Sequence, residues 1–137
     1  MEAKRKVRVL VVDDSESIRL FVRTLMSSLG SEVVGEAANG REALELFDSL
    51  APGLVLLDIN MPVMDGISAL KEIRARSQKV AVVMLSALSS LDVVQVCLDA
   101  GANYHLRKDL SVEQLRREIG ETWQWLAHIT AQGGSLY

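Results

Sequence analysis

The chain has a single cysteine, Cys97, among its 137 residues. One cysteine cannot form an internal disulfide or half of a zinc site, and it fits a reducing compartment, the cytoplasm. The sequence also has no apolar run near the ~20 residues that span a bilayer, and its N-terminus has no signal-peptide pattern. We therefore expect a cytoplasmic protein with no membrane partner.

Proline is nearly as scarce, with two residues, and neither sign of charge dominates. With 49% hydrophobic and 24% charged residues, the composition is typical of compact globular proteins and excludes a disordered chain. The formal net charge of −3 is small, and its sign is wrong for a nucleic-acid-binding surface. We expect no nucleic-acid partner.

Five strand-helix units follow one another along the chain. Short apolar segments predict strands at residues 7–12, 32–37, 54–57, 80–85 and 103–107. Apolar residues at helical spacing follow each strand, and the last two buried stripes include Val93, Cys97, Leu98, Val112, Leu115, Ile119 and Trp123. Parallel crossovers require a helix and are right-handed, so the alternation predicts a doubly wound α/β domain with a five-stranded parallel sheet.

The length indicates one domain, since ~100 to 200 residues per domain is usual. We expect a lead-in at residues 1–6, the domain at 7–129 and a flexible tail at 130–137. The sequence Ser111-Val-Glu-Gln114 predicts a capping box at the start of the last helix.

Polar residues stand at the predicted carboxyl ends of four strands. They are Asp13 and Asp14 after the first strand, Asp58 after the third, Ser86 after the fourth and Lys108 after the fifth. Each one alone fits a helix cap, a solvated turn or a surface charge. In an open α/β sheet, however, ligands bind outside the carboxyl ends of the strands. The sequence therefore predicts three carboxylates, a hydroxyl and an ammonium at one rim.

Three clustered carboxylates repel one another and raise one another's pKa unless a cation offsets them. Mg²⁺ suits an all-oxygen site and combines a few carboxylates with phosphoryl oxygen and water. A carboxylate can also act as a nucleophile and form an aspartyl phosphate. With Lys108 as a cation and the Ser86 hydroxyl as a donor, the rim has the parts needed for phosphoryl transfer by positioning and electrostatics.

Four segments carry a resemblance to a known family: VLVVDDS at 9–15, LLDINMPVMDG at 56–66, MLSA at 84–87, and AGA at 100–102 followed by Lys108. In this order and strand context they resemble the receiver domain of two-component response regulators, the CheY-like family, over roughly residues 7–128. The resemblance implies a flavodoxin-like (βα)5 fold with the strand order 2-1-3-4-5.

The resemblance also implies a metal site. Asp14, Asp58 and the backbone carbonyl of Asn60 are expected to hold Mg²⁺, and Asp13 is expected to support the ion through its bound water.

The same resemblance assigns the phosphoryl chemistry. Asp58 is the expected phosphoacceptor, Ser86 the hydroxyl that follows the phosphoryl group, and Lys108 its cationic partner. Asn60 and Leu88 occupy the two positions that tune hydrolysis. The domain is expected to catalyse its own phosphorylation and dephosphorylation and is not an enzyme in the conventional sense.

The implied partners are proteins. A phosphohistidine on a sensor histidine kinase or a histidine phosphotransfer protein is the expected donor, with small donors such as acetyl phosphate. A downstream target is expected to bind helix 4, strand 5 and helix 5 of a single-domain response regulator. Trp125 falls off the buried stripe of the last helix and is a candidate anchor for a target or for a homodimer.

Two positions depart from the family pattern. Asp109 follows Lys108 where the family usually has proline, so we expect a trans peptide bond or a rearranged loop. His105 occupies the aromatic switch position, and strand alternation places Tyr104 on the opposite face. We hypothesise that His105 is a rotameric switch coupled to Ser86, and the alternative is a static surface imidazole.

Three other functions remain open. A dehalogenase-like phosphohydrolase is disfavoured because it carries Asp-x-Asp-x-Thr on its first strand, whereas Asp58-Ile-Asn60 follows the third. A nucleotide or flavin module is disfavoured because no glycine-rich phosphate loop is present. A pseudo-receiver, a binding module that no longer uses phosphate, is suggested by His105 and Asp109, but the intact set of strand-end residues argues against it.

Overall fold

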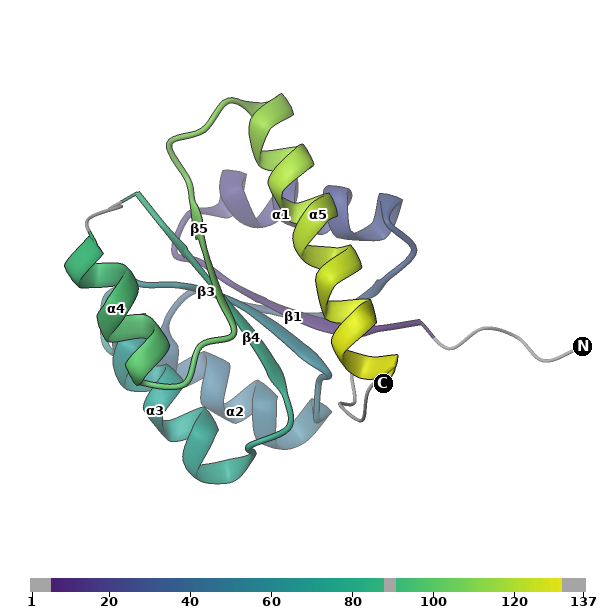
Figure 1. Cartoon of the computed structure of the whole chain (residues 1–137). Helices are drawn as coiled ribbons and strands as arrows, with labels where there is room; N and C mark the ends of the chain where they lie inside the picture. Colours follow the sequence, from purple (N-terminus) through teal and green to yellow (C-terminus); the bar gives the residue numbers. More distant parts are fainter. Residues whose placement is uncertain (1–5, 88–90, 132–137) are drawn as a thin grey trace, which may run out of the picture.

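The computed structural model describes residues 6–87 and 91–131, with side chains described as far as residue 124 (Figure 1). The strands are β1 (Arg8–Val12), β2 (Glu32–Ala37), β3 (Leu54–Asp58), β4 (Ala81–Ser86) and β5 (Tyr104–Arg107). The helices are α1 (Glu16–Ser28), α2 (Gly40–Leu50), α3 (Gly66–Arg76), α4 (Leu91–Asp99) and α5 (Val112–Ala131). The five predicted strand-helix units are all present.

The five strands form one parallel sheet in the order β2-β1-β3-β4-β5, which confirms the predicted fold. Helices α1 and α5 cover one face, and α2, α3 and α4 cover the other (Figure 1). Strands β3 and β4 lie in the middle of the sheet and are buried along their whole length. Burial on both faces explains why their sequences are continuous apolar runs.

Polar side chains cap the first turns of α1 and α5, a few residues after the preceding strands end. The Ser15 hydroxyl accepts a hydrogen bond from the backbone N–H of Ile18 at the start of α1. At the start of α5, Ser111 and Gln114 each accept a hydrogen bond from the other's backbone N–H, at 3.2 and 3.0 Å, which confirms the capping box. These short connections keep the strand-end residues close to the rim of the sheet.

Two apolar residues predicted in buried stripes are instead exposed. Leu98 of α4 is 43% exposed and Val112 of α5 is 58% exposed. Leu98 belongs to α4, which contacts the edge strand β5 and buries only Cys97 fully. Val112 is the first residue of α5, one turn before the buried Leu115. Trp123, in contrast, packs against the core as predicted.

The last helix extends to Ala131, so residues 130 and 131 of the expected tail are helical. Residues 132–137 of that tail, most of the lead-in, Leu88 and the side chain of Trp125 lie outside the described part of the chain. None of the helices within the described part is both long and apolar enough to cross a bilayer.

Candidate functional site

Three carboxylates meet at the carboxyl ends of β1 and β3. Asp13 and Asp14 follow β1, and Asp58 is the last residue of β3. One oxygen of each of the three lies within 4.8 Å of an oxygen of the others. Asp13 and Asp58 are buried, whereas Asp14 is exposed. The structure thus brings together all three acids that the sequence placed at this rim.

Lys108, which directly follows the edge strand β5, contacts two of these carboxylates. Its Nζ forms an ion pair with Asp13 Oδ2 and lies 3.0 Å from Asp58 Oδ1. Its backbone N–H donates to the Ser86 carbonyl at 2.8 Å, and this bond holds the lysine beside the end of β4. The side chain is only 16% exposed, so the ammonium interacts with the acids in a partly desolvated environment.

The surroundings of Asp58 shift its proton affinity. Burial raises the pKa of Asp58 to about 6; the hydrogen bond from Lys108 opposes this, and the nearby Asp13 and Asp14 charges add to it. Burial alone would lower the pKa of Lys108, but its hydrogen bonds to Asp13 and Asp58 outweigh burial and raise that pKa. Three acids and one ammonium leave a formal charge of −2, so these oxygens fit a divalent hard cation such as Mg²⁺.

Ser86 and Asn60 lie beside this cluster. Ser86 is the last residue of β4 and is buried, and the register pairs the preceding Leu85 with Asp58. Ser86 therefore stands one step beyond Asp58 toward the carboxyl edge of the adjacent strand. Asn60 is exposed two residues after Asp58, in the loop between β3 and α3.

His105 lies below the rim in β5, opposite Met84 of β4. Because side chains alternate along a strand, the side chains of Met84 and Ser86 share one face of β4. The imidazole is half-buried, and its Nε2 atom has no hydrogen-bond partner among the described residues. Burial lowers the pKa of His105, so the ring is neutral near pH 7. An unsatisfied buried nitrogen makes this position of the ring energetically unfavourable.

The segment after Lys108 contains the Asp109 that replaces the usual proline. The Lys108–Asp109 peptide bond is trans, as expected. The Arg107 guanidinium donates to both carboxylate oxygens of Asp109, at 2.9 and 2.7 Å. The residues on either side of Lys108, Arg107 and Asp109, are thus joined by a two-pronged ion pair.

Two residues that support the site were not identified from the sequence. A Cβ atom added to Gly66 would lie 1.9 Å from the Asp58 backbone oxygen, so only glycine fits against the end of β3. Arg19 of α1 donates from Nη1 to the backbone carbonyl of Asp13 at 2.6 Å. Gly66 stands in a segment that carried the family resemblance, but Arg19 looks like any polar residue of an amphipathic helix.

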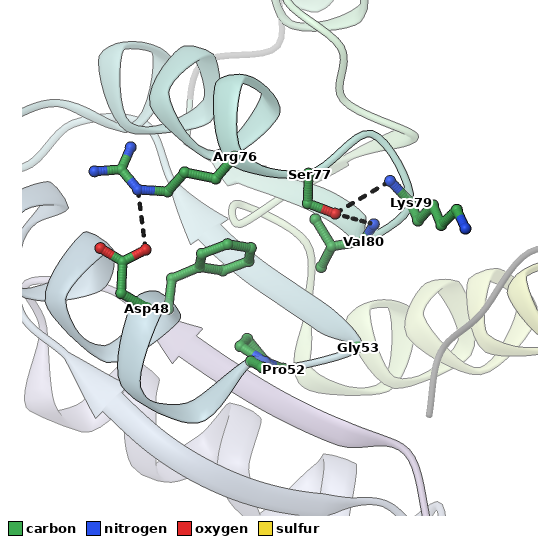
Figure 2. A pocket seen from close by; sticks show the side chains of 9 residues that line it. Asp48, Pro52, Gly53, Arg76, Ser77, Lys79 and Val80 are labelled. Carbon is green, nitrogen blue, oxygen red and sulfur yellow. Dashed lines mark hydrogen bonds and ion pairs between the residues drawn. The ribbon is translucent and has the colours of Figure 1, made fainter.

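A separate hollow of about 390 Å³ lies at the opposite end of the sheet, between the ends of α2 and α3 (Figure 2). Arg76 Nε lies 3.0 Å from Asp48 Oδ1 there, and the Ser77 hydroxyl accepts from the backbone N–H groups of Lys79 and Val80. None of the strand-end residues lines this hollow. The acidic rim is therefore the candidate site.

Comparison with known proteins gives a consistent family. A model of the response regulator receiver domain matches residues 9–120. The chain is 36% identical over 115 residues to the chemotaxis protein CheY of Bacillus subtilis, which covers 84% of this chain and 96% of that protein. It is 44% identical over 116 residues to a protein-glutamate methylesterase/protein-glutamine glutaminase of a Nocardioides species, covering 82% of this chain but 32% of that protein.

A solved structure agrees with the sequence matches. The CheX-CheY-BeF3-Mg²⁺ complex from Borrelia burgdorferi contains a chain that aligns with a TM-score of 0.78 at 31% identity, covering 85% of this chain and 88% of that one. This chain therefore spans nearly the whole of CheY and about a third of the methylesterase.

Proposed function

The chain belongs to the family of response regulator receiver domains, which act in two-component signalling, and we propose that it accepts a phosphoryl group on Asp58 and then switches a protein-binding surface. One observation carries this proposal. The buried Asp58 carboxylate lies 3.0 Å from the Lys108 ammonium, in a cluster with two further carboxylates. This arrangement has a nucleophile and a cation in place for an incoming phosphoryl group.

The proposed donor is a phosphohistidine of a sensor histidine kinase or a histidine phosphotransfer protein, or a small molecule such as acetyl phosphate. A carboxylate oxygen of Asp58 forms the new P–O bond while the P–N bond to the donor imidazole breaks. The electron pair of the broken bond stays on the imidazole nitrogen, which takes up a proton. With a pKa of about 6, Asp58 is mostly ionised at pH 7 and therefore able to attack.

The other rim residues stabilise charge. Lys108 offsets the charge on the phosphoryl oxygens, and the Ser86 hydroxyl donates to one of them. Bound Mg²⁺ would supply further charge neutralisation there. Asp14, Asp58 and the Asn60 carbonyl would hold the ion, with Asp13 supporting the site beside them.

We place the protein in the cytoplasm, where such donors act. Its turnover is limited to its own phosphorylation and dephosphorylation, so it is a switch and not an enzyme in the conventional sense.

The proposed output surface is formed by α4, β5 and α5. Among the described residues, five of the seven exposed large apolar side chains lie on these three elements: Leu91, Val96, Leu98, Tyr104 and Val112. Exposed apolar side chains gathered on neighbouring elements are typical of a protein-binding surface. A downstream target protein is the proposed occupant, and a second copy of the chain is the alternative.

Intact mass spectrometry after incubation with acetyl phosphate and Mg²⁺ tests the proposal. We expect the addition of one phosphoryl group, and we expect Asp58→Asn to abolish it because the nucleophile is lost. Asp65→Asn is the matched control, since Asp65 caps α3 in the same loop and asparagine caps equally well. This variant should still form the adduct.

Two outcomes would contradict the proposal. The absence of an adduct from both acetyl phosphate and a phosphorylated histidine protein would indicate a pseudo-receiver. Continued release of phosphate from many substrates would indicate a phosphohydrolase.

The switch role of His105 leads to a second prediction. We expect phosphorylation to change amide hydrogen exchange in β5 and α4, and we expect His105→Ala to reduce this response because the ring that we propose couples β5 to Ser86 is gone. His105→Phe keeps an aromatic ring and should respond like the wild type. A full response from His105→Ala would show that His105 is not the switch.

A further inference from the structure

Arg19 connects the loop that carries the acids to the neighbouring strand. From the first turns of α1, its Nη1 donates to the backbone carbonyl of Asp13 at 2.6 Å. Its Nε lies 3.5 Å from Glu36 Oε1 in β2, and the Arg19 and Glu36 side chains are only 18% and 28% exposed. A short charge-assisted bond in a partly buried place fixes its acceptor firmly.

Asp13 is held at its other polar atoms as well. Its backbone N–H donates to the Ala37 carbonyl at 3.0 Å, its Oδ1 accepts from the backbone N–H of Ser15 at 2.9 Å, and its Oδ2 pairs with Lys108. The bond from Arg19 restrains the remaining polar atom, the carbonyl oxygen.

That carbonyl belongs to the peptide unit that joins Asp13 to Asp14. Because a peptide unit is planar, fixing its oxygen also fixes the direction in which the backbone of Asp14 leaves. Asp14 is the exposed acid of the cluster, so it has the least packing to hold it in place. Its carboxylate therefore depends on the backbone for its position.

We propose that Arg19, oriented by Glu36, is a positioning residue for the divalent-cation site: it holds the Asp13–Asp14 peptide so that the Asp14 carboxylate points into the cluster. The inference rests on the proposed function only in that the cluster binds Mg²⁺. It goes beyond the rim residues, because Arg19 itself contributes no ligand and no charge-neutralising contact to the phosphoryl group.

The direction in which removal of Arg19 changes the affinity for Mg²⁺ distinguishes a positioning role from a purely electrostatic one. Removing a positive charge near three acids should strengthen the binding of a cation if charge alone matters. If Arg19 positions Asp14, its removal should weaken binding, and loss of an outer-shell partner typically weakens metal binding by about 10 to 100-fold.

Isothermal titration of the full chain with Mg²⁺ alone, without any phosphodonor, tests this inference. We expect Arg19→Met to raise the Mg²⁺ dissociation constant about 10-fold. Arg23→Met is the matched control: Arg23 lies one turn further along α1 and pairs with the same Glu36 at 2.8 Å, but among the described residues it forms no hydrogen bond or ion pair with the acidic loop. It should change the constant by less than about two-fold, because only a surface ion pair is lost.

Equal or tighter binding by Arg19→Met, or equal weakening by Arg23→Met, would overturn the inference. If Arg19→Met does not fold without Mg²⁺, as judged by circular dichroism, Arg19→Lys replaces it in the same comparison, because it keeps the charge and loses the two-pronged contact. It should weaken binding several-fold. Failure of the wild-type chain to bind Mg²⁺ would instead contradict the metal site of the proposed function.

Discussion

Replacing Gly66 with alanine is expected to lower the free energy of unfolding by about 3 kcal/mol, the upper part of the range for overpacked sites. The new Cβ would lie 1.9 Å from the Asp58 backbone oxygen and 2.9 Å from the Ile59 Cα. Both neighbours are backbone atoms at the end of a buried strand, so they cannot turn aside as a flexible side chain could. Relief requires the end of β3 or the start of α3 to move.

The same displacement should impair the site, because the backbone that moves carries the Asp58 carboxylate. A shift of about 1 Å in a reacting group can reduce reaction rates about 100-fold. We therefore expect Gly66→Ala to slow adduct formation with acetyl phosphate by about 100-fold.

Urea unfolding and the rate of adduct formation measure the two effects. Gly120→Ala is the control, since a Cβ at Gly120 in α5 would enter open space beside the helix as far as the described residues extend. The same chemical change should there leave the site intact and stabilise the helix by about 0.5 to 1 kcal/mol. Unchanged stability of Gly66→Ala would show that the contact between α3 and β3 is looser than the structure describes.

Asp58→Asn is expected to stabilise the Mg²⁺-free protein at pH 7. Folding raises the pKa of Asp58 from 3.8 to about 6, so keeping the carboxylate ionised in the native state opposes folding. At about 1.4 kcal/mol per pKa unit, the gain from removing that charge is on the order of 2 to 3 kcal/mol. Stability would thus increase in the variant that loses the phosphoacceptor.

The stabilisation should depend on pH. Between pH 4 and pH 6 the native state binds more protons at Asp58 than the unfolded state does, so wild-type stability falls as the pH rises through this interval. The difference between Asp58→Asn and wild type should be small near pH 4, grow through pH 5 to 6, and level off near pH 7.

Urea unfolding in EDTA at several pH values measures this difference. Asp65→Asn serves as the control because Asp65 is exposed at the start of α3. Asp65→Asn should change the free energy of unfolding only slightly and by the same amount at every pH. Added Mg²⁺ should stabilise the wild type more than Asp58→Asn, since the cation offsets the charge that opposes folding. The buried charge of Asp58 would not be the cause if Asp58→Asn were less stable than the wild type. The same holds if the difference in stability between the two proteins did not change with pH.

Much of the fold and the site could be predicted because the signals are local and periodic. Buried central strands require continuous apolar runs, and the capping box at Ser111 and Gln114 satisfies backbone groups within one turn. Parallel strands bring their carboxyl ends to one edge, so the strand-end positions of Asp13, Asp58 and Lys108 were enough to predict that they meet.

The tertiary structure alone decided the features that depend on contacts between distant segments. Leu98 and Val112 follow an apolar pattern, yet they are exposed: α4 packs on the edge strand β5, and Val112 precedes the first buried turn of α5. Neither periodicity nor a capping pattern predicts the contact of Gly66 with Asp58 or that of Arg19 with Asp13, although Gly66 stands in a segment that carries the family resemblance. Sequence periodicity reports which face of an element is buried, whereas a close approach between two elements depends on how they pack, and only the folded arrangement determines that.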